Sequence, residues 1–247
     1  MEEERRSIPI LRSILFVPAI VERFVARAPE AGADAICLDL EDSVPPAEKS
    51  RARTMAAEAI ATMPRSGQSI FVRVNGLDTD LLEDDLLAVV RPGLDGIVLA
   101  KTHAAEMVRQ ADHYLTILER QQGMEASAVS ILPLVESAEG ILNSREIAAA
   151  SPRLAGLSLG AEDLAADMGL RRSEGAREIE WPRAQLATAA AAAGLIPSTP
   201  RSRTSGTWSA WSGTPTSPAA WAFAASTAST PARWTWSTAS SLPPRRR

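Results

Sequence analysis

Short apolar runs alternate with amphipathic stretches along the first 195 residues of the chain. Apolar and β-branched runs bounded by turn residues are typical of buried strands, and the longer stretches between them have the period of surface helices. The strands predicted in this way are Ser13–Val17, Ala35–Leu40, Ser69–Val74, Gly96–Leu99, Ser130–Val135 and Leu154–Leu159. Their starts recur roughly every 25–35 residues, which is the repeat of the βαβ units that build a parallel barrel.

Helices are predicted between these strands. Pro45–Pro46 opens the first, and acidic residues lie early in the second, both of which favour helix initiation. The predicted helices are Ala47–Met63, Thr79–Val90, His103–Gln122 and Ser137–Ala150. A doubly wound sheet alternates in the same way, but no turn carries a Gly-rich phosphate loop, and polar residues of functional type follow many of the strands. The pattern therefore favours a (β/α)8 TIM barrel.

Composition sets the broad class of the protein. A chain of 247 residues has the usual size of one TIM barrel, and its formal net charge of -4 gives no sign of a nucleic-acid surface. Cys37 is the single cysteine, so no disulfide framework is expected. The N-terminus has an acidic start and a short apolar run, and matches neither a signal peptide nor a membrane span. We expect a cytoplasmic enzyme that binds neither nucleic acid nor membrane.

The composition changes near Leu195. Acidic residues are absent after Glu180, and Ile and Val are absent after Ile196. Five of the six tryptophans lie beyond this point, namely Trp208, Trp211, Trp221, Trp234 and Trp236. This part offers no apolar periodicity for strands. We therefore predict an incomplete barrel of about six βα units over residues 1–196, whose end strands lack neighbours, and an aberrant tail over residues 197–247 without native packing.

A shifted reading frame accounts for the tail. With GC-rich codons, reading the last base of each codon with the first two of the next turns residues 198–218 into a peptide such as DTPFTDVRDLERLERDTNLA. The stretch from about Ala220 then spells LGFRGKHCIHPGQVDVVN. The alternative, that Arg and Trp in the tail form a stacking segment for single-stranded nucleic acid, is disfavoured by scattered Arg residues and the absence of Lys.

Two acidic residues follow successive predicted strands. Glu136 comes directly after Ser130–Val135, and Asp163 lies soon after Leu154–Leu159. Carboxylates at the carboxyl ends of barrel strands converge on one site, and hard divalent cations prefer carboxylate oxygens. The sequence therefore predicts that Glu136 and Asp163 bind a metal ion. The competing interpretation is that each carboxylate accepts hydrogen bonds from backbone donors at a helix N-terminus.

Five segments in order resemble one known family. They are RSILFVPA (12–19), GADAICLDLEDSVPPAEKSRAR (32–53), FVRVNGLDT (71–79), LPLVESAEG (132–140) and GAEDLAADMG (160–169). They resemble the citrate lyase β-subunit-like family of CoA-ester lyases, within the HpcH/HpaI aldolase superfamily, over about the first 195 residues. The resemblance implies a TIM barrel that uses Mg2+, or Mn2+ in its place, to cleave or form a carbon–carbon bond beside an acyl-CoA thioester. The peptides recovered from the shifted frame resemble the strand-seven and strand-eight region of the same family.

The resemblance, together with the chemistry, assigns candidate roles. Glu136 and Asp163 would hold the metal ion, and Glu136 would also contact the substrate. Arg73 would grip a substrate carboxylate with its planar fork of donors, although it could instead only pair with Glu41 or Asp42. Glu41 and Asp42 would orient metal-bound water or Arg73, and we favour Glu41 over Asp39 for this role.

Two further cations are candidate substrate contacts. Arg12 would meet the phosphates of coenzyme A, and Lys101 resembles a lysine that the family carries after its fourth strand. The expected partners are an acyl-CoA ester, such as malyl-, citramalyl- or citryl-CoA, and a small keto acid. With an intact C-terminus, the resemblance also implies a homotrimer in which a neighbouring subunit caps the site. The alternatives are a class II pyruvate-type hydroxy-keto acid aldolase and an inactive truncated member of the family.

Overall fold

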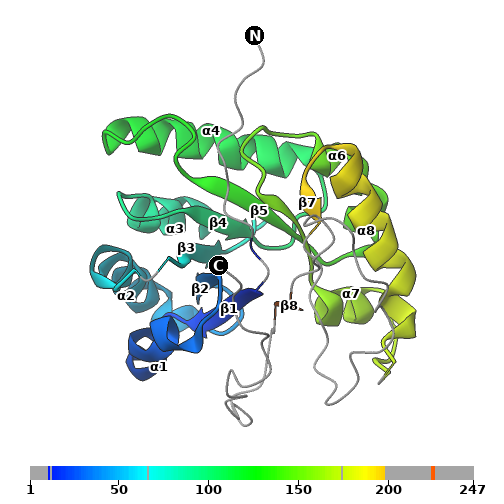
Figure 1. Ribbon diagram of the computed structural model, residues 1–247, viewed down its shortest axis with the longest axis horizontal. Coiled ribbons are helices and arrows are strands. Elements are labelled where there is room, and N and C mark those ends of the chain that lie inside the picture. Colours follow the sequence, from blue (N-terminus) through cyan, green and yellow to red (C-terminus); the bar gives the residue numbers. More distant parts are fainter. Residues whose placement is uncertain (1–10, 12, 66, 174, 198–223, 226–247) are drawn as a thin grey trace, which may run out of the picture.

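Parallel strands in sequential order form the centre of the molecule (Figure 1). The computed structural model describes residues 11, 13–65, 67–173, 175–197 and 224–225. Their strands form one sheet in the order β7-β6-β5-β4-β3-β2-β1-β8. The six longer strands are β1 (Ser13–Pro18), β2 (Ala35–Asp39), β3 (Ser69–Val74), β4 (Gly96–Leu99), β5 (Ser130–Val135) and β6 (Gly156–Leu159). The predicted incomplete barrel of six βα units is confirmed.

Two very short strands extend the sheet at its ends. In β7 (Ile196–Pro197), Ile196 pairs with Gly156 of β6, and in β8 (Ala224–Ala225), Ala224 pairs with Ser13 of β1. The expectation that both end strands lack neighbours is therefore wrong at these positions. A parallel edge presents unpaired N–H and C=O groups that any extended backbone satisfies, whatever its side chains. The rest of the tail, residues 198–223 and 226–247, lies outside the described residues, and the division of the chain between residues 196 and 197 stays a prediction.

Helices connect the strands and cover the outside of the sheet (Figure 1). They are α1 (Glu22–Arg27), α2 (Lys49–Thr62), α3 (Leu82–Val89), α4 (Ala105–Gln121), α5 (Ala138–Leu142), α6 (Ser144–Ala148), α7 (Ala161–Asp167) and α8 (Glu180–Ala192), with 3-10 turns η1 (Ala28–Ala31), η2 (Pro46–Glu48) and η3 (Arg177–Ile179). The single helix predicted over Ser137–Ala150 is two helices, because the chain turns at Asn143, whose side-chain amide donates to the carbonyl of His103 at 2.9 Å.

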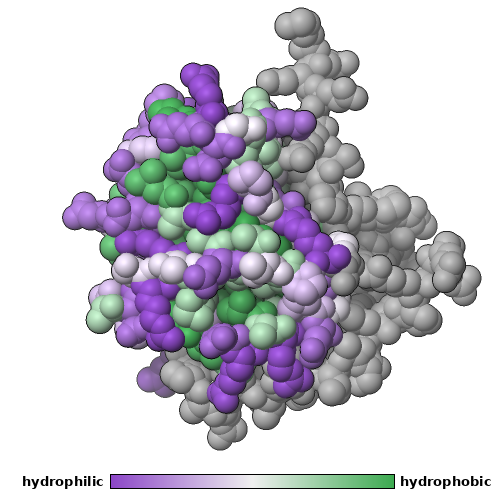
Figure 2. All heavy atoms as spheres, turned by 90° about the vertical axis from the view of Figure 1, so that its left-hand side faces the viewer, coloured by the Kyte–Doolittle hydropathy of each residue, from purple (hydrophilic) through white to green (hydrophobic). Residues whose placement is uncertain are grey.

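The helix layer faces water. Around α2 and α3, hydrophilic side chains are interspersed with smaller hydrophobic areas (Figure 2). None of the helices in the described residues is long and apolar enough to span a bilayer.

Alternate strand residues contribute to two separate cores. The larger core lies between the sheet and the helices and includes Ile36, Val72 and Leu115. The smaller core occupies the inner face of the sheet and consists of Leu11, Ile14, Phe16, Ala35, Cys37, Phe71, Val98, Leu132 and Leu134. Because side chains two apart on a strand share a face, the inner positions that follow Cys37, Phe71 and Leu134 are Asp39, Arg73 and Glu136. The inner face is therefore apolar at depth and charged at the carboxyl ends of the strands.

Candidate active site

Arg73 of β3 is the centre of the charged group at the strand ends. Its side chain is buried, with a residue exposure of 5%. Its Nε donates to Oδ1 of Asp39 at 2.7 Å, and its Nη2 donates to Oδ2 of Asp39 at 2.6 Å. Its Nη1 lies 3.0 Å from Oε2 of Glu41. The predicted neighbour Glu41 is thus in place, but the bidentate partner is Asp39, which the sequence analysis ranked lower. The register explains the difference, because Asp39 and Arg73 are directly paired across β2 and β3.

The Asp39–Arg73 pair remains fully charged at neutral pH. Burial by itself raises the pKa of Asp39, but hydrogen bonds and the charge of Arg73 outweigh burial, and the pKa is lowered. Burial likewise acts to lower the pKa of Arg73, and Asp39 reverses this, so that the pKa is raised. A buried ion pair of this geometry has its desolvation cost offset by several charge-assisted hydrogen bonds.

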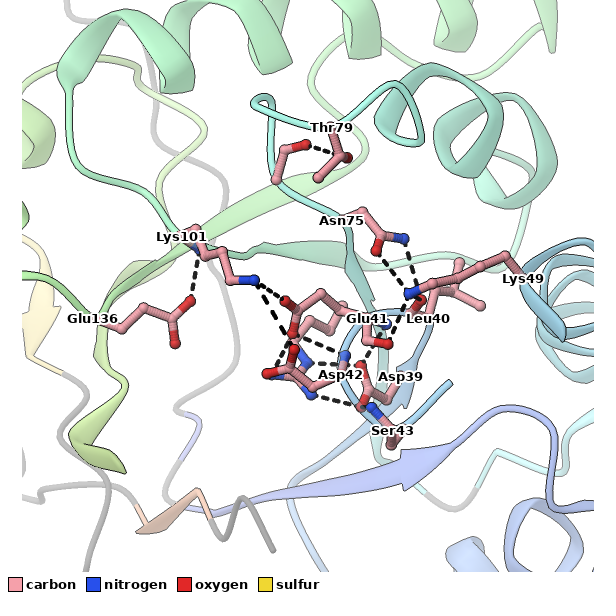
Figure 3. Close-up of polar contacts among 12 residues, drawn as sticks. Asp39, Leu40, Glu41, Asp42, Ser43, Lys49, Asn75, Thr79, Lys101 and Glu136 are labelled. Carbon is pink, nitrogen blue, oxygen red and sulfur yellow. Dashed lines mark hydrogen bonds and ion pairs between the residues drawn. The ribbon is translucent and has the colours of Figure 1, made fainter. Parts of the chain in front are cut away.

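Glu41 bridges two cations (Figure 3). Its Oε2 faces Arg73, and its Oε1 lies 3.0 Å from Nζ of Lys101. Burial raises the pKa of Glu41, against the attraction of Arg73 and the hydrogen bond from Lys101. Asp42 lies farther out, with Oδ2 3.8 Å from Nη1 of Arg73 and Oδ1 4.0 Å from Nζ of Lys101. Its side chain is 44% exposed. Glu41 therefore orders the two cations from inside, and Asp42 faces them from the solvent side.

Lys101 links this group to the predicted metal site. Its Nζ contacts Glu41, while its backbone N–H donates to Oε1 of Glu136 at 2.7 Å (Figure 3). The backbone at Lys101 has a φ of 53°, which is the left-handed region that non-glycine residues seldom adopt. The buried Thr102 holds this turn, because its N–H donates to Leu134 O and its hydroxyl donates to Leu99 O. The strained turn is what aims the N–H of Lys101 at Glu136.

Glu136 and Asp163 face one another. Glu136 follows β5 and is 6% exposed, whereas Asp163 lies in the first turn of α7 and is exposed. Burial, together with the charge and hydrogen bonding of Asp163, raises the pKa of Glu136 to about 8, although the N–H of Lys101 acts in the opposite direction. Gly160 makes room for this arrangement, because a Cβ there would lie 2.3 Å from Oε2 of Glu136.

The two carboxylates fit a divalent cation. The charge of Asp163 disfavours the ionised form of Glu136, and a hard cation between the two carboxylates would remove this repulsion. Glu136 is not needed to cap the following helix, because the hydroxyl of Ser137 accepts from Gly140 N at 3.1 Å. Within the described residues no group of three or more His, Cys, Asp or Glu side chains forms a larger metal cluster. Water and substrate would therefore supply the other ligands of an octahedral Mg2+.

The structure thus places most of the predicted site residues together. Arg73, Glu41, Asp42, Lys101 and Glu136 meet at the strand ends, and Asp163 faces Glu136. Arg12 lies outside the described residues. The sequence analysis did not identify the buried Lys49 and Asn75, which contact the end of β2 from behind. Both residues lie in segments that carry the family resemblance, residues 32–53 and 71–79. Their contacts, however, join helices and strands that are distant in sequence.

A partly closed parallel barrel with charged residues at the carboxyl ends of its strands is the architecture of TIM-barrel enzymes. The chain belongs to the HpcH/HpaI aldolase/citrate lyase family, whose profile matches residues 12–200. It is 38% identical over 184 residues to the citrate lyase subunit beta of Leuconostoc mesenteroides subsp. cremoris, covering 74% of this chain and 61% of that protein. It is 42% identical over 157 residues to the L-malyl-CoA/beta-methylmalyl-CoA lyase of Cereibacter sphaeroides, covering 62% of this chain and 48% of that lyase. The chain therefore spans only part of these relatives.

Solved structures agree with this assignment. The protein CitE from Mycobacterium tuberculosis, in complex with magnesium, acetoacetate and coenzyme A, matches with a TM-score of 0.60 and 31% identity over 76% of this chain and 64% of that one. The citrate lyase beta subunit of M. tuberculosis with oxaloacetate and magnesium matches with a TM-score of 0.60 and 31% identity, over 77% of this chain and 78% of that one. The malate synthase of Haloferax volcanii, at 20% identity and a TM-score of 0.69, shares the fold alone.

Proposed function

We propose that this chain is a Mg2+-dependent carbon–carbon lyase that cleaves, or forms, a 3-hydroxyacyl-CoA ester of the malyl-, citramalyl- or citryl-CoA type, with acetyl-CoA and a keto acid as products. The observation that carries the proposal is the junction at Lys101, where the Arg73 group and the Glu136–Asp163 pair meet. One half of the site suits a substrate carboxylate, and the other half suits a divalent cation that polarises the keto-acid oxygens when bound.

Arg73 is the carboxylate-binding residue in this proposal. A guanidinium carries five N–H donors, and Asp39 occupies the Nε and Nη2 side. Glu41 forms an ion pair with Nη1, and Asp39 uses neither the hydrogens of Nη1 nor the second hydrogen of Nη2, so a substrate carboxylate can bind on this side. Because Asp39 holds the guanidinium fixed, little side-chain entropy is lost when the substrate binds.

Lys101 supplies positive charge close to the metal site. Its side chain is 45% exposed, and its pKa is raised by the hydrogen bond and charge of Glu41, so the ammonium stays protonated. Bond cleavage places negative charge on the thioester oxygen of the acetyl-CoA product, and fixed cations and dipoles in a partly buried site stabilise such charge strongly. Glu41 and Asp42 each lie against both Lys101 and Arg73, and so hold the two cations at the same end of the site.

The relatives support this choice of substrates. The names of two groups of relatives refer to citrate lyase and to malyl-CoA lyase, and one solved homologue holds magnesium, acetoacetate and coenzyme A. We extend the same partners to this chain, with Arg12 at the coenzyme A phosphates and a homotrimer as the complete assembly. A homologue in complex with magnesium and pyruvate favours, as the second candidate, an aldolase that acts on free hydroxy-keto acids.

An assay with matched substrates tests the proposal. A frame-corrected form of the protein, whose tail carries the peptides recovered from the shifted frame, is incubated with malyl-, citramalyl- and citryl-CoA, and with free hydroxy-keto acids, in the presence of Mg2+ or of EDTA. We expect Mg2+-dependent release of acetyl-CoA, which Arg73→Lys lowers at least about 100-fold because the fork of donors is lost. Arg65→Lys is the control, because the Arg65 side chain is 40% exposed and pairs with Asp95 away from the site. Turnover of the free acids alone would favour the aldolase, and turnover of neither group would refute a catalytic role for this form.

A further inference from the structure

We propose that Lys49 is a positioning residue for Glu41, acting through the backbone at the end of β2. The inference rests on the proposed function, because it assigns Lys49 to the same site. Lys49 is the first residue of α2 and has an exposure of 8%. It lies behind the strand ends and contacts neither Arg73 nor Lys101 through any hydrogen bond of the described residues.

All three N–H donors of the Lys49 ammonium are used. Nζ donates to Leu40 O at 2.6 Å, to Glu41 O at 2.8 Å and to Oδ1 of Asn75 at 2.8 Å (Figure 3). An ammonium has three donors and no acceptor, so its hydrogen bonding is complete. Each of these oxygens is uncharged, and two of them belong to adjacent peptide groups. The contacts of Lys49 are therefore directed at a backbone position and not at an opposite charge.

Asn75 fixes the ammonium from the other side. Its Nδ2 donates to Leu40 O at 3.1 Å and to Oδ2 of Asp85 at 2.6 Å. Asp85 of α3 is fully buried and also accepts from Nε of Arg53 at 2.7 Å. The network thus runs from α2 and α3 to the end of β2, with each buried polar group paired. Fully paired buried networks of this kind hold a single geometry.

The backbone segment that Lys49 binds, Leu40 and Glu41, carries the carboxylate that bridges the two cations of the site. Leu40 N donates to Arg73 O at 3.0 Å, so the backbone of Leu40 is fixed to β3 through its N–H and to Lys49 through its carbonyl. The Glu41 carboxylate bridges Arg73 and Lys101 at 3.0 Å each. Without the ammonium, Glu41 O keeps only the N–H of Val44 and Leu40 O keeps only Asn75, and the segment shifts to reach water. Such a shift separates Glu41 from both cations, and a displacement of about 1 Å in a site of this kind can lower the rate about 100-fold.

Arg153 provides a matched control. It is as buried as Lys49, with an exposure of 5%, and it binds Asp112, Glu119 and Thr116. It also donates to Val129 O, so its network lies where the chain enters β5 and β6, at the opposite end of the strands from the site. Arg153→Met therefore removes a similarly buried cation that makes no contact with the end of β2.

The experiment compares Lys49→Met, Asn75→Ala and Arg153→Met by hydrogen exchange in the full chain, and by kcat/KM with malyl-CoA and Mg2+ in its frame-corrected form. We expect Lys49→Met to raise exchange over residues 40–44 and to lower kcat/KM at least tenfold. Asn75→Ala keeps the ammonium, and should raise exchange over residues 40–44 and lower kcat/KM to a smaller extent. This variant replaces Lys49→Met in the test if Lys49→Met fails to fold. Arg153→Met should lower the melting temperature comparably, raise exchange near residues 127–131 and leave kcat/KM within about twofold.

Unchanged exchange over residues 40–44 in both Lys49→Met and Asn75→Ala, or a uniform loss of protection with kcat/KM unchanged, would overturn the inference. If the frame-corrected chain without these substitutions turns over none of the acyl-CoA esters, the proposed function fails. The exchange measurement then still decides whether Lys49 holds the end of β2.

Discussion

Asp39 binds Arg73 through both carboxylate oxygens, and the two residues are direct partners in the register of β2 and β3. The same carboxylate accepts from the backbone N–H groups of Glu41 and Ser43 at 2.9 and 3.3 Å. One side chain therefore fixes both the guanidinium and the turn that carries Glu41. Cζ of Arg73 also lies 5.5 Å from the centre of the Phe16 ring, which covers the guanidinium from the apolar layer of the inner face.

Asp39→Asn is expected to weaken both stability and carboxylate binding. The amide removes the charge of a buried pair, and breaking such pairs costs about 3–5 kcal/mol. Because the folded pKa of Asp39 is lowered, its contribution is present above its ordinary value of 3.8 and is lost as the pH falls through the folded pKa. Urea unfolding from pH 2 to 7 should therefore show a shallower acid limb for the variant. Asp84→Asn, with a side chain 62% exposed, is the control and should stay within about 0.5 kcal/mol.

Glu136→Gln and Asp163→Asn are expected to abolish Mg2+ binding while the fold is kept. Because the pKa of Glu136 is raised to about 8 in the metal-free protein, Mg2+ binding at pH 7 should displace a proton. Calorimetry in buffers of different ionisation enthalpy measures both the affinity and the released proton. Mg2+ affinity equal to that of the unmodified chain in both variants would show that these carboxylates are not the ligands. Mn2+ should substitute for Mg2+, since both accept octahedral oxygen ligands.

Gly160→Ala is expected to disrupt the metal site by steric means. The added Cβ would lie 2.3 Å from Oε2 and 2.5 Å from Cβ of Glu136, so the Glu136 backbone as well as its carboxylate must move. Overpacking of this kind costs about 1–3 kcal/mol. Gly175→Ala is the control, because its nearest contact would be Cγ of Arg177 at 3.7 Å. Equal Mg2+ affinity and melting temperature in the two variants would contradict the packing at Gly160.

The strands were predictable because buried parallel strands are apolar on both faces. Ser69–Val74, Gly96–Leu99 and Ser130–Val135 have the predicted bounds. The two-residue alternation along β2 places Asp39 on the same face as Glu41. That Asp39 is the bidentate partner of Arg73 became clear only from the register of β2 against β3, which pairs the two residues. Lys49 was not predictable, because it opens a helix with many charged and small residues, and its partners come from two other parts of the chain.

The tail leads to a prediction at the level of the gene. The loss of acidic residues after Glu180 and of Ile and Val after Ile196 indicates a change of reading frame near Leu195. Resequencing across the codons for residues 190–200 should reveal a missing or additional base relative to a frame that encodes the recovered peptides. One intact frame that encodes the tail as it stands, with no such base, would contradict the frameshift.

The 247-residue form is expected to have little or no lyase activity, and a frame-corrected protein is expected to be far more active. A (β/α)8 barrel closes around eight strands, and the substrate must be shielded from water for electrostatic stabilisation to act fully. Both forms are expressed side by side and assayed with malyl-, citramalyl- and citryl-CoA in the presence of Mg2+. Comparable turnover from the two forms would show that the tail has no bearing on catalysis.

The alternation of inner and outer side chains along each strand has a consequence for how this fold diversifies. Asp39 and Arg73 point to the inner face, whereas Leu38 and Val72, one residue earlier, pack in the core shared with the helices. Substitutions at inner strand ends therefore alter the chemistry of the site with little effect on helix packing, and their effects on stability should be close to additive with changes in the outer core. Such independence makes new substrate specificity accessible by few mutations, which suits a family whose members include citrate lyase subunits and malyl-CoA lyases.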